Sequence, residues 1–79
     1  MEDKKVIIYS TPSCMYCNMV KAYLTEKGVE YTDYNVQEDQ EKAREMVEMT
    51  GQMGVPVIRI GDEIIIGFDQ PRIAELLGL

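Results

Sequence analysis

The stretch VIIYSTPSCMYC, residues Val6–Cys17, decides the fold of this chain. Its first four residues form an apolar run rich in β-branched side chains, typical of a strand that is covered on both faces in a parallel sheet. Ser10–Ser13 interrupt this run. From about Met15 to Lys27, one apolar face then recurs at helical spacing, formed by Cys17, Val20 and Leu24. We therefore expect a central strand, a short loop and a helix, in that order.

The rest of the chain continues this alternation. From about Glu30 to Val36, polar and apolar side chains alternate as in a strand with one exposed face, which we expect to run parallel to the first. A helix should then carry Ala43, Met46, Val47 and Thr50 and end at Gly51. Two strands flanking the loop Gly61-Asp62 predict an antiparallel hairpin.

The chain closes with a further helix. Asp69 can cap it, and Pro71 is tolerable in its first turn. The predicted order is βαβαββα, an α/β arrangement in one domain that covers residues 1–79.

Composition and charge narrow the function classes. The 79 residues include 8 basic and 14 acidic side chains, a formal charge of −6 that repels nucleic acid and anionic membranes. Met1–Lys5 lack the features of a secretory signal, and nothing approaches the length of a transmembrane helix. We expect a cytoplasmic monomer that binds neither nucleic acid nor membrane.

Two cysteines and no histidine limit metal chemistry. A structural zinc site of the Cys or Cys/His type takes four ligands, so one chain cannot complete it. We expect no metal site and no tightly bound cofactor. A zinc site shared between two chains, or an inert structural disulfide, stays open as an alternative reading of the two cysteines.

The position of Cys14 and Cys17 between a buried strand and a helix says more than their spacing. A thiolate at a helix N-terminus meets unpaired backbone N–H groups and the positive end of the helix dipole, which lower the thiol pKa from about 8.5 to roughly 3.5–7.5 in such sites. Cys14 is therefore the candidate nucleophile. Cys17 follows one turn later and deeper, where it can resolve a mixed disulfide.

Three segments, YSTPSCMYC at 9–17, GVPV at 54–57 and GFD at 67–69, resemble the glutaredoxin family, and within it the small redoxins that reduce ribonucleotide reductase. The resemblance covers nearly the whole chain. It implies a thioredoxin fold with a four-stranded mixed sheet flanked by three helices. It also implies a dithiol thiol-disulfide oxidoreductase that reduces protein or glutathione mixed disulfides.

The resemblance assigns further site residues. Val55-Pro56 should be a cis peptide bond facing Cys14, with the Val55 backbone able to bind an extended substrate or glutathione as an added strand. A trans proline that only starts a strand is the alternative. Tyr16 could line the glutathione groove, or it is a partly exposed aromatic on the helix surface.

The start of the last helix carries a second implied contact. Gly67, Phe68 and Asp69 resemble the family segment whose backbone N–H groups and carboxylate hold the γ-glutamyl end of glutathione. Asp69 can at the same time be an ordinary helix cap.

Departures from the family pattern leave the electron donor open. Thr11 stands where a lysine usually helps to hold the glycyl carboxylate of glutathione, and Met15 replaces the usual proline. Gly67-Phe68 matches the ribonucleotide-reductase redoxins, but their arginine is replaced by Asp69. Glutathione as co-substrate and thioredoxin reductase both remain possible donors, and disulfide-containing proteins such as ribonucleotide reductase are the expected targets.

Two alternatives to an enzyme stay open. Cys14 of two chains and two glutathiones could hold an iron-sulfur cluster, with Met15 loosening the helix start, or the chain could be an adaptor. Two other sequence features have plain structural interpretations. We expect Met46, Met49 and Met53 to fill the core rather than to form a metal or partner surface. We expect the acidic run Glu38–Glu48 to form a solvated helix face.

Overall fold

The computed structural model describes residues 5–79. Met1–Lys4, which belong to the segment expected to lack a secretory signal, lie outside the described residues. The elements follow the predicted order: β1 (Val6–Ser10), α1 (Met15–Glu26), β2 (Thr32–Asn35), α2 (Gln40–Thr50), β3 (Val57–Ile60), β4 (Glu63–Ile66) and α3 (Gln70–Leu77). Within this described part, no helix is both long and apolar enough to cross a membrane.

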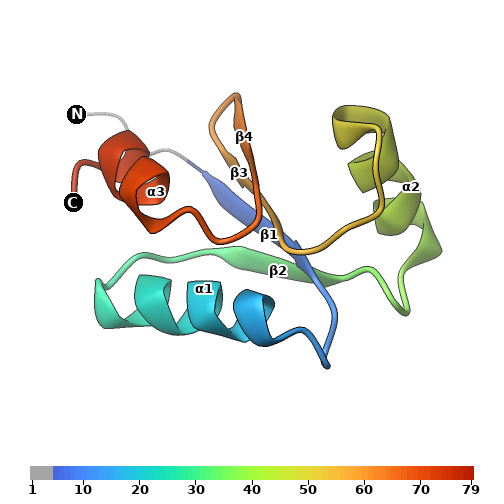
Figure 1. Ribbon diagram of the computed structural model, residues 1–79, viewed down its shortest axis with the longest axis horizontal. Coiled ribbons are helices and arrows are strands. Elements are labelled where there is room, and N and C mark those ends of the chain that lie inside the picture. Colours follow the sequence, from blue (N-terminus) through green and yellow to red (C-terminus); the bar gives the residue numbers. More distant parts are fainter. Residues whose placement is uncertain (1–4) are drawn as a thin grey trace.

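The strands form one mixed sheet in the order β2-β1-β3-β4. β1 pairs parallel with β2 and antiparallel with β3, and β3 pairs antiparallel with β4. β1 therefore lies inside the sheet, as its unbroken apolar run predicts. This is the α/β thioredoxin fold (Figure 1).

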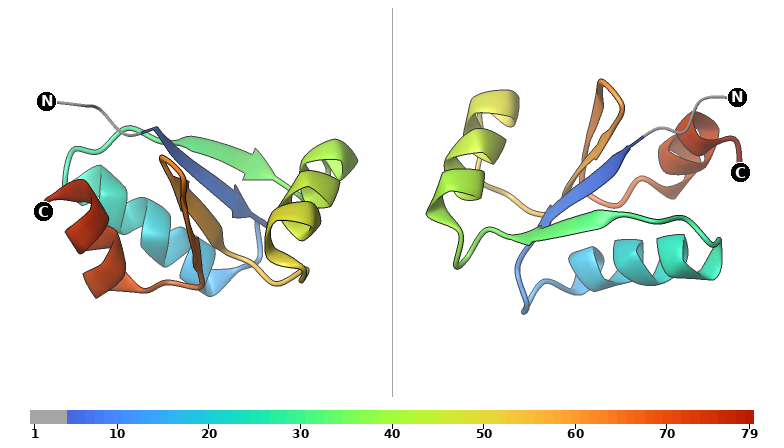
Figure 2. Two further views of the ribbon diagram at one scale, coloured as in Figure 1. Left: turned by 90° about the horizontal axis from the view of Figure 1, so that it is seen from above. Right: turned by 180° about the vertical axis from the view of Figure 1, so that it is seen from behind.

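The helices lie on both faces of the sheet, with α1 and α3 on one face and α2 on the other (Figures 1 and 2). Side chains of β1 alternate between the two faces. Val6 and Ile8 pack with Val20 of α1 and Ile73 of α3, whereas Tyr9 packs with Met46 of α2. Both faces of the central strand are thus buried.

The end of α1 shows why the helix stops where the sequence predicts. Gly28 has a left-handed φ of 72°, and its N–H donates to the Thr25 carbonyl at 3.1 Å. The Val29 N–H donates to the Leu24 carbonyl at 2.9 Å. These two bonds make a Schellman motif, which satisfies carbonyls that a helix end leaves unpaired.

A polar contact between β1 and α2 fastens this helix to the sheet. The Tyr9 ring is fully buried, and its hydroxyl donates to Glu45 Oε1 at 2.6 Å. Burial, together with the bond to Glu45, raises the pKa of Tyr9, and the same bond lowers the pKa of the Glu45 carboxyl. One member of the acidic run is therefore a structural contact, which corrects the view of that run as a wholly solvated face.

Two further expectations need correction. β2 is shorter than predicted and spans Thr32–Asn35. Met46 is buried and Met49 partly so, but Met53 is 76% exposed and does not fill the core. It precedes β3 in a segment between helix and strand, where none of the described elements covers it.

Candidate active site

Three segments meet at one end of the sheet because of the strand register. Tyr9 near the end of β1 pairs with Val57, the first residue of β3, and Val57 pairs with Ile66, the last residue of β4. The loop after β1, the segment before β3 and the segment after β4 therefore lie at the same end of the sheet. A hydrogen bond of 2.9 Å from the Gly67 N–H to the Pro56 carbonyl ties the last two together.

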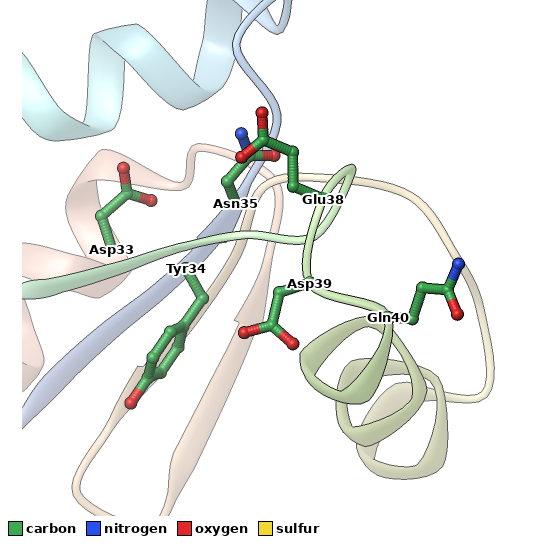
Figure 3. Close-up of a pocket in the computed structure, with 6 residues that line it drawn as sticks. All are labelled: Asp33, Tyr34, Asn35, Glu38, Asp39 and Gln40. Atoms are coloured by element: carbon green, nitrogen blue, oxygen red, sulfur yellow. The ribbon is translucent and has the colours of Figure 1, made fainter.

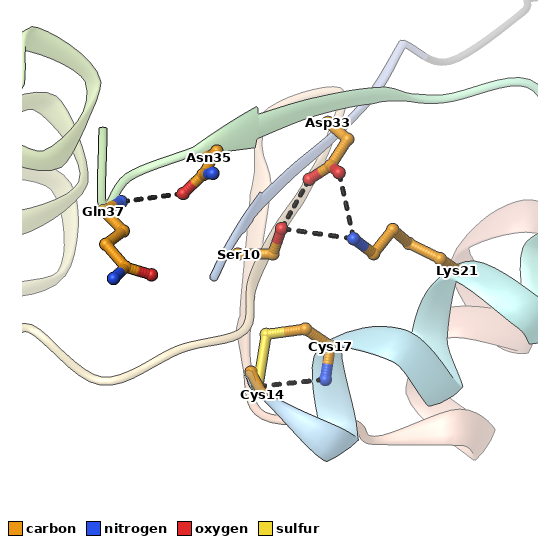
Figure 4. Close-up of polar contacts among 7 residues, drawn as sticks. All are labelled: Ser10, Cys14, Cys17, Lys21, Asp33, Asn35 and Gln37. Carbon is orange, nitrogen blue, oxygen red and sulfur yellow. Dashed lines mark hydrogen bonds and ion pairs between the residues drawn. A yellow bond between two sulfur atoms is a disulfide. The ribbon is translucent and has the colours of Figure 1, made fainter. Parts of the chain in front are cut away.

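Cys14 is the N-cap residue of α1. Its backbone is extended, and its Sγ accepts a hydrogen bond from the Cys17 N–H at 3.1 Å (Figure 4). The Cys14 N–H donates to the Thr11 carbonyl at 3.2 Å, which closes the short loop after β1. The sulfur thus takes the place of the oxygen of a usual N-cap side chain. A thiolate there would receive the same N–H and face the positive end of the helix dipole.

The two cysteines form a disulfide and differ in exposure. Their Cα atoms lie 5.2 Å apart, within the range of protein disulfides. Cys14 is half-buried, whereas Cys17 is fully buried. Because an external disulfide can approach only the more exposed sulfur, the arrangement suits Cys14 for attack and Cys17 for resolution.

The Val55-Pro56 peptide bond is cis, as the family resemblance predicts. Pro56 is buried and Val55 is half-buried. Val55 precedes the first paired residue of β3, so its backbone lies outside the sheet register. The pairing of this backbone with an extended substrate stays a prediction.

The segment Gly67–Asp69 has structural roles that limit its part in binding. Gly67 has a left-handed φ of 86°, and its N–H is already bonded to Pro56. The Phe68 ring packs against Tyr23 of α1 at a centroid distance of 5.9 Å. Asp69 Oδ1 accepts from the Arg72 N–H at 3.3 Å, which makes it the predicted cap of α3. Binding of glutathione by this segment remains a prediction.

Two exposed apolar side chains follow Cys14 at the start of α1. Thr11 is half-buried, while Met15 and Tyr16 are 72% and 60% exposed. Tyr16 therefore lies on the helix surface, where a bound molecule could still contact it. Met53 is also exposed, in the segment before the cis proline.

A polar cluster beside the disulfide went unrecognised in the sequence. The Ser10 hydroxyl donates to Asp33 Oδ1 at 2.6 Å, and Lys21 Nζ lies 3.0 Å from Asp33 Oδ2 (Figure 4). The one available sequence signal was the spacing of Lys21, four residues after Cys17 on one helix face. No signal in the sequence around Asp33 indicated that β2 would place this residue beside Lys21.

An open depression of about 630 Å³ lies where β2 ends and α2 begins (Figure 3). Its lining includes the carboxylates Asp33, Glu38 and Asp39, with Tyr34, Asn35 and Gln40. Within residues 5–79, no group of three or more histidine, cysteine or acidic side chains is placed to hold a metal ion. The depression is thus an acidic surface next to the end of β1.

Comparison with known proteins agrees with this geometry. The glutaredoxin family model matches residues 6–65. A glutaredoxin-like 8.6 kDa protein from the rubredoxin operon of Clostridium pasteurianum is 43% identical over 70 residues, which are 89% of this chain and 93% of the relative. The glutaredoxin-like protein NrdH of Lactococcus lactis subsp. cremoris is 35% identical, over 90% of this chain and 97% of its own length.

A solved structure shares the fold. NrdH-redoxin from Escherichia coli superposes with a TM-score of 0.78 and 26% identity, covering 91% of this chain and 93% of that one. With the family model, the relatives and the cysteine pair in agreement, this chain belongs to the glutaredoxin family, as a glutaredoxin-like redoxin of the thioredoxin superfamily.

Proposed function

We propose that this redoxin carries electrons to protein disulfides through its dithiol and is recharged by a protein reductase of the thioredoxin-reductase class rather than by glutathione. The observation that carries the exchange chemistry is the Cys14 sulfur, half-buried and bonded to the first turn of α1, with Cys17 buried behind it.

The reaction follows from that arrangement. Cys14 thiolate attacks one sulfur of the target disulfide, the other target sulfur leaves as a thiolate and takes up a proton, and a mixed disulfide forms. Cys17 then loses its proton and attacks Cys14 Sγ, which releases the second target sulfur. Two electrons have moved to the target, and the reductase returns them to the Cys14–Cys17 disulfide.

The charges at the site favour a protein donor over glutathione. Glutathione carries two carboxylates, but Thr11 stands where the family lysine would bind one of them. Lys21, the basic side chain bonded to the end of β1, is already paired with Asp33. The acidic depression adds repulsion for an anion.

The exposed apolar side chains favour the same choice. Met15 and Tyr16, the two residues between the cysteines, provide exposed surface that another protein can bury. The E. coli relative is described as having a thioredoxin-like activity profile. Ribonucleotide reductase is a candidate target, since the family's NrdH members resemble this chain.

The test compares two donors. NADPH oxidation is followed with thioredoxin reductase and insulin, and in parallel with glutathione, glutathione reductase and hydroxyethyl disulfide. We expect faster turnover with thioredoxin reductase. Faster turnover with glutathione would overturn the choice of donor, and no turnover with either would overturn the dithiol carrier itself.

Two variants sharpen the comparison. Thr11→Lys supplies the missing cation, and we expect it to raise the glutathione-coupled rate about tenfold, the value of one charge-assisted contact of roughly 1.4 kcal/mol. Thr25→Lys adds the same charge at the far end of α1 and should change nothing. An equal effect of both variants would show that only the net charge matters.

A further inference from the structure

Ser10, Lys21 and Asp33 form a hydrogen-bonded cluster whose role the exchange reaction leaves unassigned. Ser10 is 2% exposed and is the polar residue buried in the described core. Its hydroxyl donates to Asp33 at 2.6 Å and accepts from the Lys21 ammonium at 3.5 Å. One side chain each from β1, α1 and β2 therefore meet in one contact.

The spacing along α1 places the cluster near the resolving cysteine, Cys17. Lys21 follows Cys17 by four residues, so the two share a face of α1, and helical side chains lean toward the N-terminus, here toward Cys17. Ser10 lies on the same face of β1 as Ile8, which packs against α1. Figure 4 shows Lys21 extending from α1 toward Ser10 and Asp33, with the disulfide one turn earlier on the helix.

Cys17 is the sulfur most sensitive to such charges. It is fully buried, and it must become an anion before it can attack the mixed disulfide. The stability of an anion that has little access to water depends strongly on the charges of neighbouring groups.

The charged groups of the cluster are Lys21 on α1 itself and Asp33 on β2, which form an ion pair. On α3, which packs on the same face of the sheet, the carboxylate of Asp69 is used to cap its own helix. Arg59 of β3 alternates to the opposite face, where its charge acts on Tyr9 and Glu45.

We propose that this cluster sets the charge around the buried sulfur of Cys17, Lys21 favouring the resolving thiolate and Asp33 opposing it, with Ser10 holding the two in place. The three are positioning residues, and the proposal rests on the exchange reaction proposed above. In the step concerned, the Cys17 Sγ–H bond is broken and the proton passes to solvent. The new Sγ–Sγ bond to Cys14 then forms as the bond from Cys14 to the partner sulfur breaks.

The experiment isolates this step. Reduced protein is mixed with dithiobis(nitrobenzoate), which releases one coloured thiolate when Cys14 is attached and a second when Cys17 resolves the mixed disulfide. The rate of the second release is measured against pH. We expect Lys21→Met to slow it about threefold at neutral pH and move its midpoint up by about one pH unit, and Asp33→Asn to do the reverse.

Opposite signs are the decisive result. A cluster that only fastens α1 to the sheet would give losses of the same sign in both variants. The double variant Lys21→Met/Asp33→Asn should return close to the starting profile, and Lys21→Arg should keep it. Shifts of one sign, or none, would overturn the proposal.

Controls separate this proposal from the exchange chemistry. Lys42→Met removes a lysine from a similar ion pair with Glu45 on α2, across the sheet from α1, and should leave the second release unchanged. Release of one thiolate only by the unsubstituted protein would instead refute the proposed exchange reaction. The two failures are therefore distinguishable.

Discussion

At the scale of single residues, Cys14 is both the cap of a helix and the more exposed of the two sulfur-bearing residues. It caps α1, since its sulfur accepts the Cys17 N–H at 3.1 Å, and it is the sulfur that an external disulfide can reach. The hydrogen bond that stabilises the helix start is therefore available to stabilise the thiolate. The cap and the proposed activation of the thiolate would therefore use the same interaction.

This dual role predicts a low pKa for the Cys14 thiol. In reduced Cys17→Ser protein, the rate of alkylation by iodoacetamide should rise with pH at a midpoint of roughly 3.5–7.5, below the ordinary value of about 8.5. The same variant unfolded in urea supplies the ordinary midpoint as control. Equal midpoints for folded and unfolded protein would contradict activation by the helix.

Tyr9 shows how one buried hydroxyl can matter to stability. Tyr9→Phe removes the 2.6 Å bond to Glu45 and should lower the free energy of unfolding by about 1 kcal/mol at neutral pH, measured in urea. Tyr34→Phe, which trims a hydroxyl from the neighbouring half-buried ring, is the control and should cost less.

The same contact has a pH signature. Because the bond to Tyr9 lowers the pKa of Glu45 below its ordinary value of 4.5, the stabilisation from this carboxylate is complete above that pH and is lost as the pH falls through the lowered pKa. Burial raises the pKa of Tyr9, so its contribution is complete below pH 10 and is lost at more alkaline pH. The difference between Tyr9→Phe and the unsubstituted protein should shrink in acid, and a constant difference would argue against the linkage.

At the scale of elements, each helix begins at a side chain that satisfies its first N–H groups. Cys14 caps α1, Asp39 caps α2 by accepting the Lys42 N–H at 3.1 Å, and Asp69 caps α3. The sequence predicted the Asp69 cap from its place before Pro71. The cap of α1 is the unusual one, because a sulfur replaces the usual oxygen.

Asp69 allows its structural and binding roles to be separated. Asp69→Ala should lower the free energy of unfolding by about 1 kcal/mol, whereas Asp69→Ser keeps a capping oxygen and should cost only a few tenths. Urea unfolding of both variants is the measurement, and equal losses would contradict the cap. If Asp69→Ser instead raised the KM for glutathione, the carboxylate would also be a binding group.

At the scale of the whole molecule, stability comes from a small core divided between the two faces of the sheet. A chain of 79 residues has an expected free energy of unfolding of about 4–12 kcal/mol, from 0.05–0.15 kcal/mol per residue. A single deep cavity in such a domain consumes a large part of that margin.

Two isoleucines of the hairpin test this view of the core. Ile58 is fully buried in β3, and Ile58→Ala should cost about 2–5 kcal/mol. Ile66 lies on β4 with an exposed side chain, and Ile66→Ala should change the free energy by about 0.5 kcal/mol or less. Similar urea midpoints for the two variants would show that the described burial does not determine stability.

The sequence by itself determined the order of elements, the buried central strand and the placement of Cys14 at the start of a helix. Apolar periodicity and cap chemistry act over a few residues, so they can be read without knowing the rest of the chain. The cis Val55-Pro56 bond was also anticipated, but from family resemblance and not from these local rules.

Only the tertiary structure decided which distant side chains meet. Tyr9 and Glu45 are 36 residues apart and Ser10 and Asp33 are 23 apart, and neither pair has a local signal. Their contacts exist because strand order and register place β2 beside β1 and carry α2 across the opposite face. A contact between distant residues depends on the packing of whole elements, which no short stretch of sequence specifies.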